Sequence, residues 1–468
     1  MRYRLTHTEN SPRLLLIFAG WGMDDLVMSQ LRRPGYDVAV VWDYSSFHIN
    51  WDFTERYSEI CLFAWSMGVY AASQTIQAIE PKVTLRIAVN GTTTPINDRK
   101  GIPEAIFFGT LDNLSETALN KFFRRMASTR EDFDFFNKRR PGRNIDELRG
   151  ELQSIADRTI LDTPSEMRWD VAVVGRDDRI FPRFNQLRAW EGKASRIHQL
   201  EKGHFFDFAP LIDLYVIDKG STAKRFASST ETYDENASVQ VDAAERLINL
   251  LKANKLQPTM MAAKNDILEI GSGTGSLTRL MAAMVKDARI LLWDLAGELP
   301  AGLPLGRRYA FRNCDAEIEL ARQAPGSLDH IFSASTIQWF NSPERFFINA
   351  HRALGRDGYL FLTTYTRGNL HEISDITGNA LPLLTPAEWE RLASPYFEMV
   401  AMESYTRDLD FDTPLEVLRH LKLTGVNSLG RSSRGEIAVH DILNRLPMRL
   451  DGRYHLTYRP LLMILRKK

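Results

Sequence analysis

One serine in the N-terminal half lies where a chain would expose a nucleophile. Ser66 stands in "LFAWSMGVYAASQ", residues 62–74, between an apolar run that predicts a strand and a small-residue run that predicts a helix. The pattern A-W-S-M-G differs at one residue from G-x-S-x-G, in which small neighbours permit a tight strand-to-helix turn. Ala64 replaces the first glycine, and Gly68 retains the second. This turn predicts attack by a serine hydroxyl on a carbonyl carbon.

An acid and a histidine follow this serine in the chain order Ser, acid, His that such turns use. Asp178 ends the predicted strand in "VAVVGRDDRIFP", and His204 lies in the loop after the next predicted strand. We choose Asp178 because the D-x-I-x-P run begins there, and we expect Asp177 to be its solvated neighbour. In this interpretation His204 removes the proton from Ser66, while Asp178 orients and stabilises the imidazolium.

Attack on a carbonyl also needs hydrogen-bond donors for the oxyanion. The first expected donor is the backbone N–H of Met67, the residue after the nucleophile. The second is expected from the loop after the first predicted strand, where Gly20 and Gly22 allow a backbone N–H to turn inward. We assign it to Trp21. The alternative is that the Trp21 indole is only a wall of the pocket.

A second site is indicated in the C-terminal half by "ILEIGSGTGSLTRL". Glu269 lies two positions before Gly271, and Gly273 and Gly275 complete the pattern G-x-G-x-G. A dinucleotide fingerprint needs its third glycine one position later, where this chain has Ser276. Glycines permit close approach of a ligand to the backbone. The pattern therefore predicts a site for S-adenosylmethionine (SAM), and a glycine turn without a cofactor is the alternative.

Two further acids lie at the ends of the next two predicted strands. Asp294 follows the glycines by about twenty residues, where an acid would accept hydrogen bonds from both ribose hydroxyls. Asp315, in "NCDAE", lies where an acid would accept from the adenine amino group. Each aspartate alone would more simply be a strand-end or cap residue. Their joint spacing predicts that both bind the cofactor.

The elements that must position these residues are two series of strands alternating with helices. Short apolar runs in the first two hundred or so residues predict a parallel sheet covered on both faces. A helical insert at about 100–165 interrupts the series and is expected to form a cap over the site. The polar stretch 218–238 predicts a junction before the second series. The expected fold class is α/β, with two doubly wound domains, 1–217 and 218–468.

The N-terminal domain resembles a known esterase family. The stretches "LIFAGWGMD", "FAWSMGVYAA", "GRDDRIFP" and "KGHFFDF" are similar to the BioG type of pimeloyl-ACP methyl ester esterases, where ACP is acyl carrier protein. The resemblance implies an α/β-hydrolase with a helical cap that removes a methyl ester from a carrier-bound dicarboxylic acyl chain. By position, Ser66, Asp178 and His204 match the triad of that family, and Trp21 matches its oxyanion loop.

The C-terminal domain resembles the BioC type of malonyl-ACP O-methyltransferase. The likeness includes "FASSTETYDENASVQ", "LEIGSGTG" and "HLTYRPLLMILRK", and it implies a Rossmann-like, SAM-dependent methyltransferase in which Tyr233 closes over SAM. Methyl transfer to a carboxylate depends on positioning and desolvation, because the nucleophile is already ionised and the donor is a sulfonium. Candidates for holding that carboxylate are Tyr365, Arg367 and His371, and a solvated loop is the alternative for all three.

Composition limits the class of protein. The chain has 468 residues, with 59 Lys and Arg against 59 Asp and Glu, and this balance gives no support for nucleic-acid binding. No stretch approaches the eighteen or so apolar residues of a membrane span, and the first apolar run is too short for a secretory signal. Two distant cysteines are expected to be free thiols. We expect a cytoplasmic protein without a membrane partner, and we predict no metal site.

The two resemblances imply one bifunctional enzyme of biotin-precursor synthesis. Its C-terminal domain would methylate malonyl-ACP, and its N-terminal domain would hydrolyse pimeloyl-ACP methyl ester once the masked chain has been elongated. One alternative is the same pair of activities on a free small carboxylic acid. Another is a methyltransferase with an inactive, hydrolase-like binding module. Basic residues of the insert, including Arg124 and Arg125, favour an acidic carrier, although a solvated helical face explains them equally.

Overall fold

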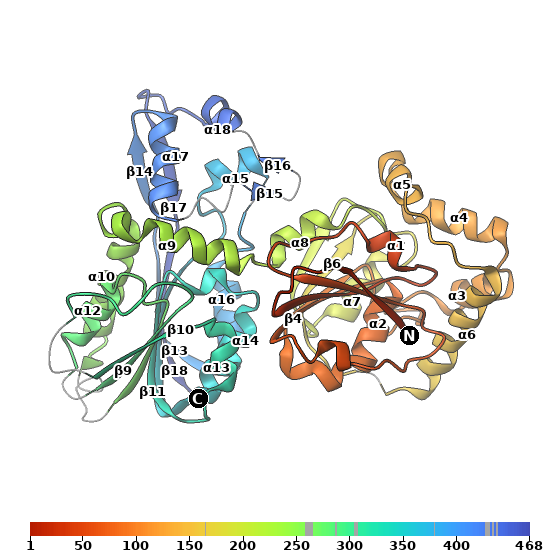
Figure 1. The fold of residues 1–468 in the computed structure, drawn as a ribbon, viewed down its shortest axis with the longest axis horizontal. Coiled ribbons are helices and arrows are strands. Elements are labelled where there is room, and N and C mark those ends of the chain that lie inside the picture. The colour runs from red at the N-terminus through yellow and green to blue at the C-terminus, as the bar shows by residue number, and fades with distance from the viewer. Residues whose placement is uncertain are drawn as a thin grey trace. The chain divides into compact units, whose positions relative to one another are not determined.

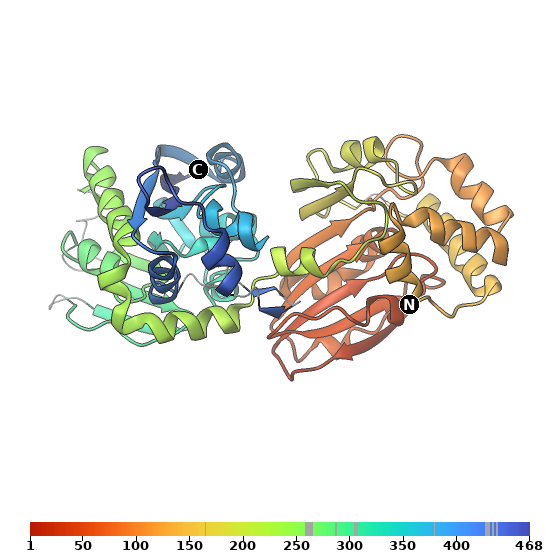
Figure 2. The same cartoon turned by 90° about the horizontal axis from the view of Figure 1, so that it is seen from above.

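The computed structural model describes residues 1–468 except 164, 258–264, 286–287, 304–307, 379, 426–430, 433–434 and 437–438. The chain forms two compact units, Met1–Ile212 (unit 1) and Asp213–Lys468 (unit 2). Figures 1 and 2 show that each unit has its own central sheet with helices around it. The α/β fold class predicted from the sequence is confirmed. The division into folding domains between residues 217 and 218 stays a prediction.

Unit 1 is built on a seven-stranded sheet with the order β1-β3-β2-β4-β5-β6-β7. β1 is antiparallel to β3 and all other pairs are parallel, so the carboxyl ends of six strands lie at one edge. β3 to β6 are buried at every residue, as expected for a parallel sheet covered on both faces. The strands are β1 (Arg2–His7), β2 (Arg13–Phe18), β3 (Asp37–Trp42), β4 (Glu59–Trp65), β5 (Val83–Val89), β6 (Trp169–Gly175) and β7 (Ala194–Leu200).

Four helices are inserted between β5 and β6 and are drawn in orange and yellow in Figure 1. They are α3 (Glu104–Asp112), α4 (Glu116–Met126), α5 (Arg130–Asn137) and α6 (Ile145–Leu161). The remaining helices are α1 (Asp25–Met28), α2 (Met67–Thr75), α7 (Arg183–Trp190), α8 (Ala209–Tyr215), and the short 3-10 helices η1 (Asp52–Thr54) and η2 (Ile76–Lys82). The insert is the helical cap that the sequence predicts.

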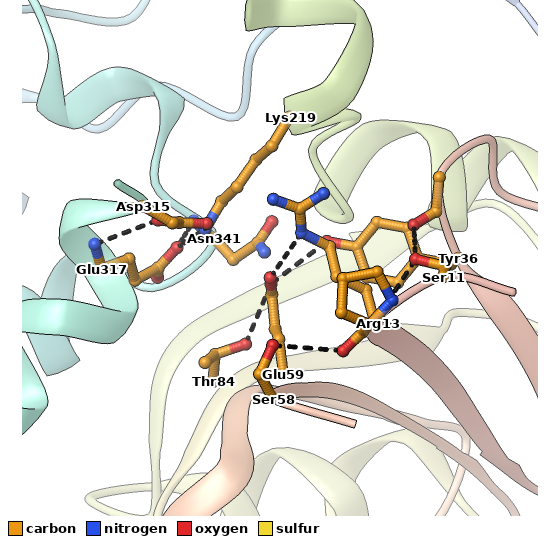
Figure 3. Close-up of polar contacts among 12 residues, drawn as sticks. Ser11, Arg13, Tyr36, Ser58, Glu59, Thr84, Lys219, Asp315, Glu317 and Asn341 are labelled. Carbon is orange, nitrogen blue, oxygen red and sulfur yellow. Dashed lines mark hydrogen bonds and ion pairs between the residues drawn. The ribbon is translucent and has the colours of Figure 1, made fainter. Parts of the chain in front are cut away.

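A buried carboxylate fixes the amino ends of the central strands of unit 1 (Figure 3). Glu59, the first residue of β4, is fully buried. Its oxygens accept hydrogen bonds from Arg13 Nε (2.9 Å) and the hydroxyls of Tyr36 (3.1 Å) and Thr84 (3.3 Å). These donors come from β2, β5 and the residue before β3, so one satisfied buried charge ties four strands together.

Unit 2 has a second seven-stranded sheet with the order β10-β9-β8-β11-β12-β18-β13. The first five strands are parallel, and β18 is antiparallel to both of its neighbours. Its strands are β8 (Asp266–Ile270), β9 (Arg289–Asp294), β10 (Arg308–Asn313), β11 (Leu328–Ala334), β12 (Leu354–Tyr365), β13 (Phe397–Ser404) and β18 (Pro460–Lys467). Two small antiparallel pairs join β14 (Arg407–Phe411) to β17 (Tyr454–Tyr458) and β15 (Arg431–Ser432) to β16 (Gly435–Glu436).

Helices cover both faces of the second sheet. One core cluster includes Phe347 and Trp389, and the other includes Leu247 and Met281. The helices are α9 (Lys219–Asn236), α10 (Ser238–Ala253), α12 (Ser276–Ala282), α13 (Ala316–Arg322), η3 (Ile337–Trp339), α14 (Pro343–Ala353), α15 (His371–Thr377), α16 (Pro386–Ala393), α17 (Pro414–Leu423) and α18 (Val439–Arg445). Within the described parts of both units, no helix has the length and apolar character needed to cross a membrane.

Candidate functional site

The turn after β4 holds Ser66 in a strained conformation. Its φ is 59° and its ψ is −128°, and non-glycine residues rarely adopt a positive φ. Close packing around the turn requires glycine at two places. A Cβ on Gly68 would lie 2.5 Å from the Ala19 carbonyl oxygen, and one on Gly91 would lie 2.2 Å from the Ser66 carbonyl oxygen. The turn therefore presents the Ser66 hydroxyl at the start of α2.

Ser66, His204 and Asp178 form one hydrogen-bonded relay. Ser66 Oγ lies 3.0 Å from His204 Nε2, and His204 Nδ1 lies 2.9 Å from Asp178 Oδ2. All three side chains are buried. Asp178 Oδ1 also accepts the backbone N–H groups of Ile180 (2.8 Å) and Phe181 (2.9 Å), which hold the carboxylate in place. The structure thus brings together the three residues predicted from the sequence, in the geometry of a nucleophile, a base and an orienting acid.

Three residues that sequence reasoning missed hold this relay in position. Gln186 on α7 donates to Asp178 Oδ2 (3.0 Å). Trp65 Nε1 and Asn90 Nδ2 each donate to the His204 carbonyl oxygen (2.9 Å). The Asn90 side chain also accepts a backbone N–H at the end of β6 (2.7 Å). The only sequence signal for Asn90 is its place directly after a predicted strand, at the edge where the site lies.

The loop after β2 packs against the nucleophile. A Cβ on Gly20 would lie 3.1 Å from the Ser66 Cβ, so glycine lets the loop come this close. The Trp21 indole donates its N–H to the Leu148 carbonyl oxygen (3.0 Å), which makes the ring a wall between the cap and the site. The indole N–H of Trp21 is thus already used, so of the two N–H groups of this residue only the backbone N–H could donate to an oxyanion. Met67 is the first residue of α2, so its backbone N–H has no acceptor within the helix.

A buried ion pair connects the cap to the same loop. Glu151 on α6 is fully buried. Its Oε1 accepts the Tyr44 N–H (2.9 Å), and its Oε2 accepts Arg143 Nη1 (2.6 Å) and the Gly22 N–H (3.4 Å). Arg143 also donates to Asp43 (3.1 Å). Burial raises the pKa of Glu151, although the Arg143 charge acts in the opposite direction. The cap therefore fixes the loop that is predicted to carry the second oxyanion donor.

In unit 2, the turn after β8 requires glycine for two different reasons. Gly271, Gly273 and Gly275 have φ values of 77°, 48° and 87°. A Cβ on Gly271 would lie 1.9 Å from Thr336 Oγ1, whereas one on Gly273 would meet no atom within 4 Å. The hydroxyl of Ser272, between them, is buried without a hydrogen-bond partner. The turn thus packs tightly at Gly271 and leaves open space beside Gly273, with the unpaired Ser272 hydroxyl between the two glycines.

Two acids border this turn, the half-buried Asp294 and the buried Glu269. Asp294, the last residue of β9, accepts the Gly273 N–H (2.8 Å) through Oδ2 and the Ala296 N–H (3.0 Å) through Oδ1. Burial raises the pKa of Asp294, and these backbone bonds act against the rise. Glu269 on β8 accepts the Thr278 hydroxyl (2.6 Å), and burial raises the pKa of Glu269 to about 8.

Asp315 lies one strand further and has a partner that the sequence did not reveal (Figure 3). Its Oδ1 accepts the backbone N–H of Glu317 (3.1 Å), which caps α13. Lys219 Nζ donates to Asp315 Oδ2 (2.8 Å) and Glu317 Oε2 (2.6 Å). Lys219 is buried and is the first residue of α9. The acid predicted to bind adenine therefore also anchors the start of α9, and its adenine role stays a prediction.

The other end of α9 reaches the glycine turn. Asp234 accepts hydrogen bonds from the hydroxyls of Thr274 and Ser276. Its neighbour Tyr233 lines a pocket in unit 2. Burial raises the pKa of Tyr233, and the nearby carboxylate of Asp294 raises it further. Tyr233 thus stands between the acid at the end of β9 and the pocket.

Of the three residues predicted to hold a carboxylate, only Tyr365 lines this pocket. Its hydroxyl lies 3.3 Å from Ser335 Oγ, and burial raises its pKa to about 12. Arg367 is exposed and donates to both carboxylate oxygens of Glu388 (3.0 and 2.8 Å). His371 lies beside Glu372, with 3.6 Å between Nδ1 and Oε1. Tyr458, from β17, joins Tyr365 at the pocket wall and was not predicted.

Helix α4 of the cap exposes two arginines. Arg124 and Arg125 are exposed on α4, whose residues Leu119, Phe123 and Met126 are buried. Arg124 lies over the Phe133 ring of α5, at 5.3 Å from its centroid. The two predicted arginines therefore lie on the solvent side of an amphipathic helix.

The residues around the glycine turn fit SAM. The open space beside Gly273 admits a ligand against the backbone. Asp294 holds an anionic acceptor next to that space. A pyrophosphate would meet this carboxylate unfavourably, whereas ribose hydroxyls donate to it.

Comparison with known proteins relates each unit to a family. Residues 3–211 match the family model "Pimeloyl-ACP methyl esterase BioG", and residues 268–362 match a "Methyltransferase domain" model. A malonyl-[acyl-carrier protein] O-methyltransferase of Bacteroides fragilis is 34% identical over 465 residues, which cover 97% of this chain and 93% of that protein. A protein of the same name from Bacteroides helcogenes is 35% identical, covering 54% of this chain and 100% of its own. The crystal structure of BioG from Haemophilus influenzae is 33% identical and covers 44% of this chain and 94% of its own, with a TM-score of 0.40.

Proposed function

This chain belongs to the family of malonyl-[acyl-carrier protein] O-methyltransferases and carries a BioG-type unit at its N-terminus. We propose that it catalyses both the methylation that masks a carboxylate as an ester and the hydrolysis that later removes the methyl group. Unit 2, a methyltransferase with SAM as its cofactor, methylates the free carboxylate of malonyl-ACP. Unit 1, a carboxylesterase, hydrolyses the methyl ester of pimeloyl-ACP. The chain is thus a bifunctional enzyme that makes a biotin precursor in the cytoplasm.

The hydrogen-bonded relay at Ser66 carries the proposal for unit 1. His204 takes the Ser66 proton as the hydroxyl attacks the ester carbonyl, and Asp178 stabilises the imidazolium. The backbone N–H groups of Met67 and Trp21 bind the oxyanion. The imidazolium gives its proton to the departing methoxide, so methanol leaves. His204 then deprotonates a water molecule, which attacks the acyl-enzyme and frees the carboxylate.

The hydrogen bond between Gly273 and Asp294 carries the proposal for unit 2. When bound, SAM supplies an electrophilic methyl group on a sulfonium. Asp294 accepts from the ribose hydroxyls, Asp315 accepts from the adenine amino group, and Glu269 supports the turn from behind. Tyr233 closes the site from α9, and Tyr365 orients the substrate carboxylate. These residues bind, orient and exclude water, which is what transfer to an ionised nucleophile requires.

The exposed arginines of α4 favour a carrier-bound substrate over a free small acid. Acyl carriers are acidic, and exposed cations such as Arg124 and Arg125 speed the encounter with an acidic partner. A free acid would need cations only at the reacting centre. An inactive binding module is disfavoured for another reason. Binding alone gives no cause to keep a strained Ser66 and a buried Asp178–His204 pair, each of which costs stability.

One experiment tests both halves of this proposal. The chain is incubated with malonyl-ACP and methyl-labelled SAM, and separately with pimeloyl-ACP methyl ester, and the acyl products are weighed by mass spectrometry. We expect a labelled methyl on the malonyl group and loss of the methyl from the pimeloyl group. Free malonate and free pimelate methyl ester serve as parallel substrates. Equal conversion of the free and the carrier-bound forms would favour the free-acid alternative.

A further inference from the structure

The pocket beside Tyr233 is lined by hydrogen-bonding and apolar groups. Its lining combines hydroxyls and amides, among them Tyr365, Asn369 and Tyr458, with apolar side chains such as Leu370 and Trp339. Among the described lining residues there is no Lys, Arg, His, Asp or Glu. This is unusual for a site that binds a carboxylate, because Arg and Lys are the common partners of that group.

The neutral donors of this pocket are held from behind. Asn369 Oδ1 accepts the backbone N–H of Arg459 (2.9 Å), so its amide N–H groups remain for the pocket. Tyr458 is almost fully buried, and its hydroxyl lies 2.8 Å from Nε2 of His420 on α17. Burial lowers the pKa of His420 to about 4, so this imidazole is neutral near pH 7. With its proton on Nε2 it donates to the Tyr458 oxygen and leaves the hydroxyl proton for an acceptor in the pocket.

Tyr458 belongs to a group of three tyrosines near the cofactor side of the pocket. The rings of Tyr365 and Tyr458 lie 6.2 Å apart. Besides burial, Tyr365 raises the pKa of both Tyr233 and Tyr458, and Tyr233 also raises that of Tyr458. After burial and these two tyrosines, the buried Glu372 raises the pKa of Tyr458 further. Glu372 Oε2 accepts the Thr457 N–H (3.2 Å), and its Oε1 lies 3.1 Å from His455 Nε2 without a hydrogen bond. Among the described residues, the lining of the pocket therefore supplies hydroxyl donors and no charged side chain.

A fixed cation would work against methyl transfer to a carboxylate. One carboxylate oxygen uses a lone pair to bond the methyl carbon while the carbon–sulfur bond breaks and its electrons stay on sulfur. No proton moves, and the negative and positive charges disappear together. An arginine at the carboxylate would therefore stabilise the ground state more than the transition state. Neutral donors orient the oxygen and leave its charge available to the sulfonium.

We infer that Tyr458, positioned by His420, and Asn369 bind the substrate carboxylate by neutral hydrogen bonds, and that its counter-ion is the sulfonium of the bound cofactor and not a side chain of the described pocket lining. This inference rests on the proposed methylation of malonyl-ACP. It follows that the carboxylate binds well only when the cofactor carries a positive charge. The site then discriminates between substrate and ester product by charge, and does so only in the methyl-loaded state.

The test measures equilibrium binding of malonyl-ACP to the full chain at saturating sinefungin, a cationic SAM analogue without a transferable methyl, or saturating S-adenosylhomocysteine, which is neutral at sulfur. We expect Kd to be at least about tenfold lower with sinefungin, since attraction between unit charges in a buried site exceeds the 1.4 kcal/mol that this ratio represents. Malonyl-ACP methyl ester, which has lost the charge, should bind within about twofold in both states. Equal affinity of malonyl-ACP in both states would overturn the inference.

Variants separate Tyr458 from its surroundings. Tyr458→Phe should raise Kd for malonyl-ACP about tenfold or more with sinefungin, as expected for loss of a hydrogen bond to a charged group, and leave Kd for sinefungin itself unchanged. Tyr454→Phe, in the same strand β17 but outside the pocket, is the matched control and should bind like the parent chain. Unchanged binding by Tyr458→Phe would refute the assignment.

A companion assay distinguishes this inference from the proposed function. The parent chain is first tested for transfer of labelled methyl to malonyl-ACP. If it transfers the methyl but binds malonyl-ACP equally with sinefungin and S-adenosylhomocysteine, the neutral-pocket inference fails and the proposed function stands. If no methyl reaches malonyl-ACP, the proposed function fails and the inference falls with it. His420→Gln, which keeps an amide donor, should retain more affinity than His420→Leu if His420 positions the Tyr458 hydroxyl, and equal losses would contradict that role.

Discussion

Replacing Glu151 by glutamine should impair ester hydrolysis without touching the relay. The carboxylate receives three hydrogen bonds, from Tyr44 N–H, Arg143 and Gly22 N–H. A glutamine keeps the shape and one oxygen, which can still accept from Tyr44. Its amide N–H groups then face two donors, Arg143 and Gly22. The loop that ends at Gly22 therefore loses its hydrogen bond to the side chain of residue 151 on α6.

The size of the effect follows from these contacts. Removing one partner of a buried ion pair typically costs about 3–5 kcal/mol. Here the cost should be lower, because burial raises the pKa of Glu151 and so its charge is itself unfavourable. Arg143 and the Gly22 N–H would lose their acceptor, but Arg143 would keep its bond to Asp43. We therefore expect the free energy of unfolding to fall by about 1–3 kcal/mol. A displacement of about 1 Å at the oxyanion donor can reduce kcat about a hundredfold.

The assay is hydrolysis of a small methyl ester together with urea unfolding of the full chain. Glu151→Gln should lower kcat at least about tenfold, with KM nearly unchanged, because oxyanion donors act in the transition state. Methyl transfer by the same protein is the internal control. Glu147→Gln is the matched variant, since Glu147 contacts the same arginine at 3.6 Å but is 43% exposed. Normal kcat in a destabilised Glu151→Gln protein would refute the link between cap and loop.

Three further outcomes follow from the two sites. Ser66→Ala should abolish ester hydrolysis and spare methyl transfer in a product assay, and a soluble variant that loses both would contradict separate sites. Asp294→Ala should weaken SAM binding by about 1.5–3 kcal/mol in calorimetry through loss of charge-assisted ribose contacts, whereas unchanged affinity would remove Asp294 from the site. The folded pKa of Glu269, about 8, lies above its ordinary 4.5. The folded chain thus binds this proton more tightly, and the cofactor-free protein should lose stability as pH rises through that interval. The stability of Glu269→Gln should not show this loss with rising pH. If the stability of the variant and of the parent chain changed with pH in parallel, the raised pKa of Glu269 would be contradicted.

The relay could be found from the sequence because its geometry is local to strand ends. A nucleophile turn, an acid and a histidine that each follow a parallel strand must meet at one sheet edge. The residues that hold the relay gave no comparable signal. Gln186 and Asn90 are ordinary polar residues whose partners lie up to 114 positions away. Their catalytic support depends on tertiary contacts that no spacing rule encodes.

The proposed carboxylate site of unit 2 shows the opposite limit. The sequence indicated Tyr365, Arg367 and His371 as candidates. β12 ends at Tyr365, and beyond it Arg367 pairs with Glu388 outside the pocket. Tyr458 comes instead from β17, which leads into β18, and β18 runs antiparallel to β12 with Pro460 opposite Tyr365. An antiparallel strand added from the end of the chain could not be registered from alternation alone.

If a methyltransferase and an esterase share one chain, each of the two sites must release its own product. In unit 2 the charges that hold the substrate disappear in the reaction, so the ester meets only the neutral donors around Tyr458. In unit 1 the proposed reaction creates a charge instead, because a neutral ester becomes a carboxylate beside the Ser66–His204–Asp178 relay. The two proposed reactions therefore change the charge of the bound acyl group in opposite directions. In unit 2 this change removes the attraction between substrate and cofactor once the ester has formed.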